Sequence, residues 1–352
     1  MTGDTPRPAA GPPALGAPRI AALTPWRATP GGRVLIQGGP FALTHGLPEI
    51  RIGDDRVRAS FASPSVLAAV VPRSHAGGAL PVRLDDAPGE TAFLDVGREL
   101  VTGVHAVDSP LLDVDGSVFV TCSGSRGQQT PVSIYRVSPG GLREIFATGI
   151  INATSLAFDP HGVMHVTSRF DGTVVKVARD GTSSVVASGL GVACGLVFAR
   201  DGTLFVGDRT GTIHRRDPDG DLDVFATLPP SMAAYHLALG RDETLYVSVP
   251  TLSSRDAVYR IDPDGEVGVL TTALGRPQGL AVDPAGDLYV VDAVAGASGL
   301  YRVPLEDEGA PELVVAGEGL IGVAFDRHGG FVLASNDTVW RFLGAGGSAA
   351  PM

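Results

Sequence analysis

Short apolar segments with period-two alternation recur along residues 99–343, and turns rich in Asp and Gly separate them. Alternation of apolar and polar positions is typical of half-buried strands. Asp and Gly tolerate the positive φ that tight hairpin turns require. No stretch has the periodicity of an amphipathic helix, so the pattern predicts an all-β protein.

One unit of this pattern occurs six times: a small residue, an apolar strand, an Asp/Gly turn, a second apolar strand and a polar residue. The copies are SPLLDVDGSVFVTC from Ser109, SLAFDPHGVMHVTS from Ser155, GLVFARDGTLFVGD from Gly195, HLALGRDETLYVSV from His236, GLAVDPAGDLYVVD from Gly279 and GVAFDRHGGFVLAS from Gly322. They follow one another at intervals of 46, 40, 41, 43 and 43 residues. Further strand-like segments follow each copy, and four antiparallel strands per roughly 40–45 residues are typical of a propeller blade. We therefore predict a six-bladed β-propeller over residues 98–343.

The last copy is too short to form a whole blade. After TVWRFL at 338–343 only GAGGSAAPM remains, so this blade lacks an outer strand. Residues 98–106, RELVTGVHA, can supply it and thereby hide an exposed strand edge. We predict a composite last blade that joins the two ends of the ring.

The region before the propeller has a different pattern. Residues 18–97 contain short alternating strands, such as RVLIQG, between Pro/Gly turns, which predicts a small β-sandwich. Residues 1–17, rich in Pro, Ala and Gly, are predicted to be a disordered tail, and residues 344–352 a flexible one.

Composition and charge exclude several classes of partner. The net charge is −11; of 27 basic and 38 acidic residues, ten and eight lie in residues 1–98, which leaves 17 and 30 for the remainder. An acidic propeller argues against nucleic acid as a partner. No apolar run approaches about 18 residues, so no membrane span is expected. The first residues lack the apolar core of a secretory signal, and we expect a cytoplasmic protein.

Both regions resemble known families. GLAVDPAGDLYVVD and its copies resemble the NHL-repeat propellers and the SMP-30/gluconolactonase family over about 240 residues. The pattern PRIAALTPWRATPGGRVLIQGGPF resembles the IPT/TIG family of immunoglobulin-like domains. The resemblance implies an immunoglobulin-like β-sandwich that acts as a spacer or as a module for a protein partner. A propeller of this kind implies a small-molecule ligand at the mouth of its channel.

Aligning the copies predicts which residues surround that mouth, because the innermost strand begins where the second strand ends. The residues before the innermost strands are Asp108, Thr154, Cys194, Tyr235, Gln278 and Ile321. Nearby loops add Arg169, Arg209 and Asn336. Loops at such a mouth are where propellers bind ligands. We predict substrate contacts from Thr154, Cys194, Gln278, Arg169, Arg209 and Asn336.

The family resemblance implies a divalent metal held by a Glu, an Asn and an Asp, with the Asp as general base. Here DSP resembles the family's EGP motif, so Asp108 can replace the Glu. Tyr235 and Gln278 stand where the Asn and the Asp are expected, and a neutral Gln cannot act as a base. Asp208 as a ligand and Asp292 as a catalytic group can rebuild the site from the ends of the second strands. The cation would be Ca²⁺, Mg²⁺, Mn²⁺ or Zn²⁺.

A second chemistry is offered by blade four, where His236 replaces the small residue found in the other copies. His236 either fills a wider gap as a packing residue or reaches the pocket as an acid/base group. With Tyr235 it forms the best acid/base pair in the chain.

Three hypotheses for function remain open. The first is a metal-assisted hydrolase of a lactone or ester. The second is a non-catalytic scaffold that binds a ligand or protein. The third is a metal-free lyase or cyclase that uses Tyr235 and His236.

Overall fold

The computed structural model describes residues 18–344 except 44–45, 86–89, 295 and 307–308. Within them every regular element is a strand, so the all-β prediction is confirmed. The tail predicted for residues 1–17 and nearly all of the tail predicted for 344–352 lie outside the described residues. No helix capable of crossing a bilayer occurs in the part of the chain described.

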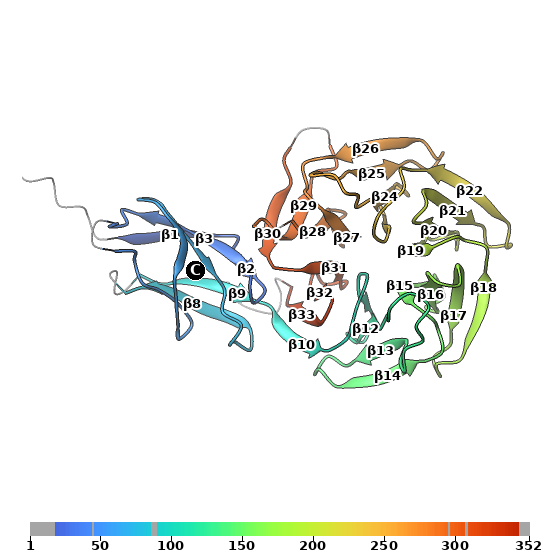
Figure 1. Cartoon of the computed structure of the whole chain (residues 1–352), viewed down its shortest axis with the longest axis horizontal. Coiled ribbons are helices and arrows are strands. Elements are labelled where there is room, and N and C mark those ends of the chain that lie inside the picture. The colour runs from blue at the N-terminus through green and yellow to red at the C-terminus, as the bar shows by residue number, and fades with distance from the viewer. Residues whose placement is uncertain (1–17, 44–45, 86–89, 295, 307–308, 345–352) are drawn as a thin grey trace, which may run out of the picture.

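Five four-stranded antiparallel sheets and four consecutive strands of a nine-stranded sheet, here called blades, surround a common centre in the described chain (Figure 1). Blade 1 contains β11 (Leu111–Leu112), β12 (Val118–Thr121), β13 (Ile134–Val137) and β14 (Arg143–Ala147). Blade 2 contains β15 (Ala153–Phe158), β16 (Met164–Ser168), β17 (Thr173–Val177) and β18 (Ser183–Ala187). Blade 3 contains β19 (Ala193–Phe198), β20 (Leu204–Asp208), β21 (Thr212–Arg216) and β22 (Leu222–Thr227).

The remaining blades follow the same order. Blade 4 contains β23 (His236–Leu239), β24 (Leu245–Ser248), β25 (Val258–Ile261) and β26 (Val267–Thr271). Blade 5 contains β27 (Pro277–Val282), β28 (Leu288–Asp292), β29 (Gly299–Val303) and β30 (Glu312–Ala316). Blade 6 contains β31 (Leu320–Phe325), β32 (Phe331–Ser335), β33 (Thr338–Phe342) and, as its outer strand, β10 (Arg98–Thr102). Strand β10 comes from the other end of the ring, so blade 6 is held together by both ends of the propeller region.

The repeated turn between the first two strands is fixed by its Asp. In blade 2, Asp159 Oδ1 accepts hydrogen bonds from the backbone N–H groups of His161 and Val163, each at 2.9 Å. Asp326 makes the equivalent bonds in blade 6. These bonds satisfy turn amides that the strand ladder leaves free, which is why Asp recurs at this position.

The core of the propeller lies between blades rather than inside them. Each joint between neighbouring blades in the described chain contains its own cluster of buried apolar side chains. Between blades 3 and 4, for example, Phe205 and Ile213 pack with Leu245 and Val247. Because every blade is buried on both faces, the position of each inner strand is fixed by two neighbours.

The N-terminal region forms two sheets that share one core. One sheet has the order β1 (Arg19–Thr24), β3 (Arg33–Gly39), β7 (Val66–Val70), β6 (Ala59–Ala62). The other has the order β2 (Arg27–Ala28), β9 (Ala92–Val96), β8 (Gly78–Leu84), β4 (Ile50–Ile52), β5 (Asp55–Val57). Ile36 and Leu67 of the first sheet pack in one cluster with Ile52 and Leu94 of the second.

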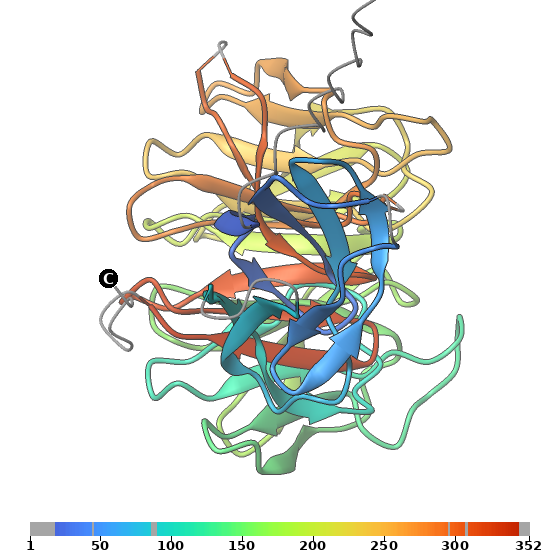
Figure 2. The ribbon, with the colours of Figure 1, turned by 90° about the vertical axis from the view of Figure 1, so that its left-hand side faces the viewer.

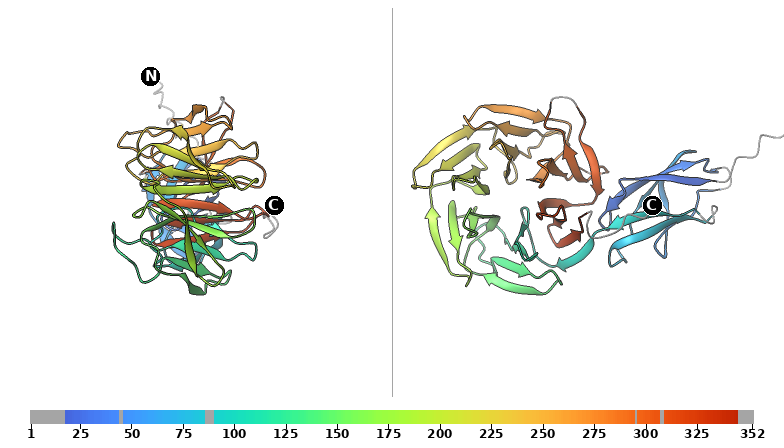
Figure 3. Two further views of the ribbon diagram at one scale, coloured as in Figure 1. Left: turned by 90° about the vertical axis from the view of Figure 1, so that its right-hand side faces the viewer. Right: turned by 180° about the vertical axis from the view of Figure 1, so that it is seen from behind.

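This N-terminal domain lies beside the ring, away from its centre, in both face views (Figures 1 and 3). Seen from its own side, it lies against the rim of the disc (Figure 2). Ala28 of β2 pairs with Ala316 of β30, so the second sheet continues into blade 5. The Thr29 amide donates to the Ala316 carbonyl at 2.8 Å. Backbone pairing therefore anchors the domain at the rim, and both face views show it beside the ring and not over its centre.

Candidate active site at the mouth of the propeller

A pocket of about 300 Å³ lies where the innermost strands begin and the second strands end, and we call it the mouth pocket. It is lined by Ala106, Val107, Arg169, Val192, Cys194, Arg209, Met232, Ala233, Ala234, His236, Gln278, Ile321 and Asn336. Six residues predicted for the site are among them: Arg169, Cys194, Arg209, His236, Gln278 and Asn336. The remaining five, Asp108, Thr154, Asp208, Tyr235 and Asp292, do not line the pocket.

The central feature of the pocket is a buried pair formed by His236 and Asp108. His236 Nδ1 lies 2.5 Å from Asp108 Oδ1, and each side chain is only 3% exposed. The same carboxylate oxygen accepts the Ser109 amide at 2.6 Å. Asp108 precedes blade 1 and His236 begins blade 4, so the pair spans the centre of the ring. Since Nδ1 is engaged, Nε2 is the ring nitrogen left for a molecule in the pocket.

The reason that His236 reaches the centre lies in the repeat. The register places His236 at the position that Gly195, Gly279 and Gly322 occupy in other blades. A Cβ on Gly279 would lie 2.5 Å from Ser109 Oγ and 2.7 Å from Gly322 Cα. Blades 5 and 6 therefore pack tightly against blade 1, whereas blade 4 carries an imidazole at the same position and meets Asp108 through it.

Tyr235 does not reach the pocket, contrary to the predicted catalytic role. Its side chain is buried in the cluster between blades 3 and 4, and its hydroxyl donates to the Pro229 carbonyl. Burial raises the pKa of this phenol further above its usual range. A Cβ on Gly207 would lie 3.0 Å from the Tyr235 Cβ, so the glycine makes room for the tyrosine. Tyr235 is thus a packing residue, and the predicted Tyr235–His236 pair is replaced by Asp108–His236.

The polar residue that ends the second strand has a structural use in blades 3 and 5. Asp208 Oδ1 accepts the amides of Val192 at 2.8 Å and Thr210 at 3.1 Å. Asp292 accepts the amides of Gly275, Arg276 and Val294 at 2.9, 2.7 and 3.2 Å, respectively. Both carboxylates thereby hold the loops of their blades, and neither faces the pocket as the predicted metal or catalytic roles require.

Two more predicted residues are also tied to the backbone. Thr154 is fully buried, and its hydroxyl donates to the Asn152 carbonyl at 2.9 Å, so it offers no substrate contact. Cys194 lines the pocket, and its thiol points to the Val192 carbonyl at 3.3 Å. Burial raises the pKa of Cys194 to about 11, which keeps it a neutral thiol near pH 7 and a poor nucleophile.

The mouth does not fit the divalent cation that the family resemblance implies. Among the described residues, no three His, Cys, Asp or Glu side chains converge as a metal site. Asp108 is bonded to His236, and its Oδ2 is a single buried oxygen without a partner in the described chain. Arg169 and Arg209 add two positive charges to the same pocket. One carboxylate facing a histidine and two guanidinium groups is not a donor set for a hard cation.

Sequence reasoning missed two features of the site. It did not identify Asp108 as the partner of His236: His236 departs visibly from the small residue of the other copies, but the position of Asp108 holds a different residue in every copy. It also missed the segment Met232–Ala234, which enters the pocket wall ahead of β23. No signal in the repeat indicated this segment, because it lies in a loop whose length differs between blades.

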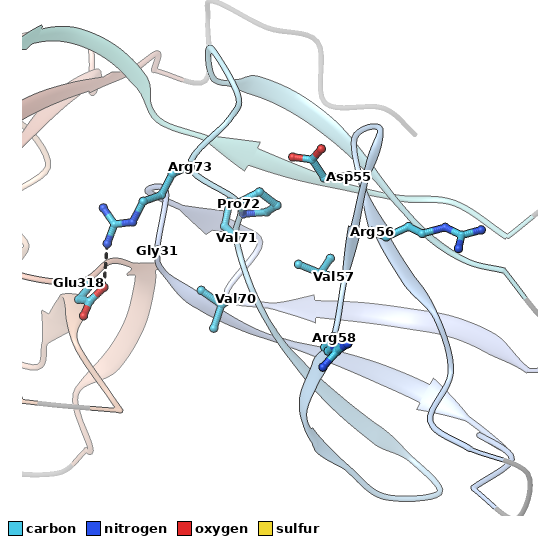
Figure 4. Close-up of a pocket in the computed structure, with 10 residues that line it drawn as sticks. All are labelled: Gly31, Asp55, Arg56, Val57, Arg58, Val70, Val71, Pro72, Arg73 and Glu318. Carbon is cyan, nitrogen blue, oxygen red and sulfur yellow. Dashed lines mark hydrogen bonds and ion pairs between the residues drawn. The ribbon is translucent and has the colours of Figure 1, made fainter.

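A second hollow lies at the rim, where the N-terminal domain meets the loop after β30, and we call it the rim groove. Its volume is about 530 Å³, and it is lined by Gly31, Asp55, Arg56, Val57, Arg58, Val70, Val71, Pro72, Arg73 and Glu318. Figure 4 shows Arg73 reaching Glu318, to which it donates at 3.0 Å. The groove is larger than the mouth pocket, but its charged side chains are exposed and it contains no buried acid/base pair.

Comparison with known proteins shows the fold and no closer relationship. No protein-family model and no curated protein matches the chain. A solved gluconolactonase from Xanthomonas campestris is similar at 15% identity, over 83% of this chain and 96% of that one, with a TM-score of 0.56. Virginiamycin B lyase from Staphylococcus aureus has 16% identity over 88% and 98%, with a TM-score of 0.51. An auxiliary nutrient binding protein from Bacteroides ovatus has 13% identity over 92% and 97%, with a TM-score of 0.52. The chain therefore shares the β-propeller fold of gluconolactonase-like and lyase-like proteins, as its repeats predict.

Proposed function

We propose that this protein is an enzyme that opens a lactone or a small ester by general-base catalysis at the mouth of a complete six-bladed propeller. His236 is the base, and Asp108 is the residue that positions it. The N-terminal sandwich is an immunoglobulin-like domain of the IPT/TIG type, which acts as a rigid spacer. The observation that supports the proposal is the 2.5 Å contact between His236 Nδ1 and Asp108 Oδ1, which brings this pair to the wall of the mouth pocket.

The chemistry follows from the geometry of the pair. With the Nδ1 proton held by Asp108, Nε2 carries a lone pair toward the pocket. It takes a proton from a water molecule as the water oxygen bonds to the carbonyl carbon of the substrate. The imidazolium then returns this proton to the ring oxygen as the carbon–oxygen bond breaks, which yields a hydroxy acid. The negative charge of Asp108 stabilises the imidazolium, and positioned acid/base groups of this kind contribute about 10²- to 10⁴-fold.

Two further observations favour this mechanism over others. The thiol of Cys194 remains protonated, so a covalent intermediate on sulfur is not favoured. The donor set at the mouth does not suit a divalent cation. The similarity to a gluconolactonase and to virginiamycin B lyase supports only that propellers of this shape occur in lactone- and lyase-type enzymes.

The test is turnover of a panel of five- and six-membered lactones and phenyl esters, followed by acid release at constant pH. We expect His236→Gln to lower turnover by at least about 100-fold. His165→Gln is the matched control, because His165 is also buried, but it lies on β16 and bonds the Val163 carbonyl away from the pocket. Equal losses in the two variants would contradict the assignment of the base.

Two additional measurements separate the alternatives. Reaction in ¹⁸O-labelled water places the label in the product carboxylate if water attacks, whereas elimination yields an unsaturated product without it and would support the lyase. A chelator is expected to leave turnover unchanged. Activity lost with the chelator and restored by Ca²⁺, Mg²⁺, Mn²⁺ or Zn²⁺ would overturn the metal-free mechanism. Ligand binding without any turnover would support the non-catalytic scaffold.

A further inference from the structure

Two arginines enter the mouth pocket from equivalent positions in neighbouring blades. Arg169 directly follows β16 in blade 2, and Arg209 directly follows β20 in blade 3. Their backbone amides make equivalent bonds, to Asn152 O at 3.3 Å and Val192 O at 3.1 Å. Both side chains line the pocket that also contains His236. The repeat thus brings two guanidinium groups to the same pocket.

Neither guanidinium has a carboxylate partner in the described chain. Arg169 donates from Nη2 to the Gly124 carbonyl at 3.3 Å, and Arg209 makes no side-chain hydrogen bond or ion pair with another described residue. No Asp or Glu lines the pocket. Asp108 and Asp208, which belong to the same end of the propeller, are engaged elsewhere, since Asp108 is bonded to His236 and Asp208 to loop amides.

The electrostatics of the wall favour a negative ligand. Partial burial lowers the pKa of Arg169, and the positive charge of Arg209 lowers it further. Two like charges held together without a counterion destabilise the empty pocket, and an anion between them removes that repulsion. Guanidinium groups also match the planar fork of a carboxylate with two parallel hydrogen bonds.

We propose that Arg169 and Arg209 form a carboxylate subsite, so that the substrate is a lactone or ester that bears a free carboxylate. The inference rests on the proposed function and names its substrate class. The carboxylate is held at blades 2 and 3, and the reacting carbonyl lies toward His236. Gln278 and Asn336 line the pocket as neutral hydrogen-bonding groups from blades 5 and 6.

The test measures binding without turnover. Tetrahydrofuran-2-carboxylate and its carboxamide have the same ring and size, and neither contains a lactone. By calorimetry with the full chain, we expect the carboxylate to bind at least about 10-fold more tightly than the carboxamide at low salt. Arg209→Gln and Arg169→Gln should each remove this preference. Arg276→Gln should keep it, because Arg276 is exposed, precedes β27 and does not line the pocket.

The outcomes separate this proposal from the preceding one. Equal affinity for the two probes, or equal loss of preference in Arg276→Gln, would overturn the subsite. If Arg169→Gln fails to fold, as judged by circular dichroism, Arg209→Gln decides alone, because its side chain has no structural bond to lose. Preference for the carboxylate without any lactone turnover would retain the subsite and remove the catalytic proposal. Equal turnover of lactones with and without a carboxylate would remove the subsite and retain the catalytic proposal.

Discussion

The mouth pocket and the rim groove differ in the burial of their charged groups more than in their volume. The groove is larger, about 530 Å³ against about 300 Å³. Its charges form exposed pairs, such as Arg73–Glu318 at 3.0 Å and Arg56–Glu49 at 3.3 Å. The mouth pocket instead is lined by His236, whose buried partner Asp108 lies outside the lining, and by two arginines without a carboxylate partner in the described chain. The mouth pocket is therefore the better candidate for a reactive site, although it is the smaller of the two hollows.

The difference has an energetic basis. A pair that remains in water loses little solvation and contributes about 0–1 kcal/mol. A pair that is 3% exposed has lost its water, and it persists only because its partners are well placed. Three predictions sharpen this comparison, in order of decreasing effect.

The largest effect is expected for Asp108→Ala. The change leaves the Nδ1 proton of His236 buried without an acceptor and removes the group that fixes its tautomer. We expect unfolding free energy to fall by about 3 kcal/mol and turnover by roughly 100-fold or more. Urea unfolding and lactone turnover measure the two effects.

A double-mutant cycle provides the control for this variant. If the two residues act as a unit, Asp108→Ala combined with His236→Gln should cost clearly less than the sum of the single changes. Additive losses would show that the two residues are not coupled. The mouth pocket would then be no better supported as a reactive site than the rim groove.

An intermediate effect is expected for Asp292→Ala, which tests whether burial alone marks a functional carboxylate. Asp292 is only 2% exposed, yet its partners are three loop amides. Leaving these amides unsatisfied should cost about 1–3 kcal/mol of unfolding free energy. Turnover of the folded variant should be preserved, because no pocket residue is changed. A loss of turnover as large as that of Asp108→Ala would restore the catalytic role predicted from the sequence.

Asp108 and Asp292 also show what the sequence could predict. The all-β propeller fold follows from the repeat, because a fixed period with Asp/Gly turns has few other solutions. The alignment of copies also selected most of the pocket wall, including Arg169, Arg209 and His236. The period of the repeat predicts where each residue lies along the backbone, and all copies of the repeat share these backbone positions.

The direction of each side chain could not be obtained from the same alignment. Asp108, Tyr235 and Gln278 occupy equivalent positions, yet only Gln278 lines the pocket. Tyr235 is turned into the joint between blades 3 and 4 because Gly207 leaves space there. Asp108 is turned toward His236, more than 120 residues away in sequence. The direction of each side chain depends on contacts between blades, and the repeat pattern of the sequence contains no information on these contacts.

The smallest effect is expected at the rim groove, for Arg73→Gln. Arg73 and Glu318 connect the N-terminal domain to the propeller, but their side chains are 72% and 67% exposed. The domain is already anchored by the Ala28–Ala316 backbone pair. We therefore expect unfolding free energy to change by less than about 1 kcal/mol and lactone turnover to stay the same. Turnover that falls in Arg73→Gln, at unchanged stability, would mean that the groove acts on the mouth, and the two hollows would no longer be independent.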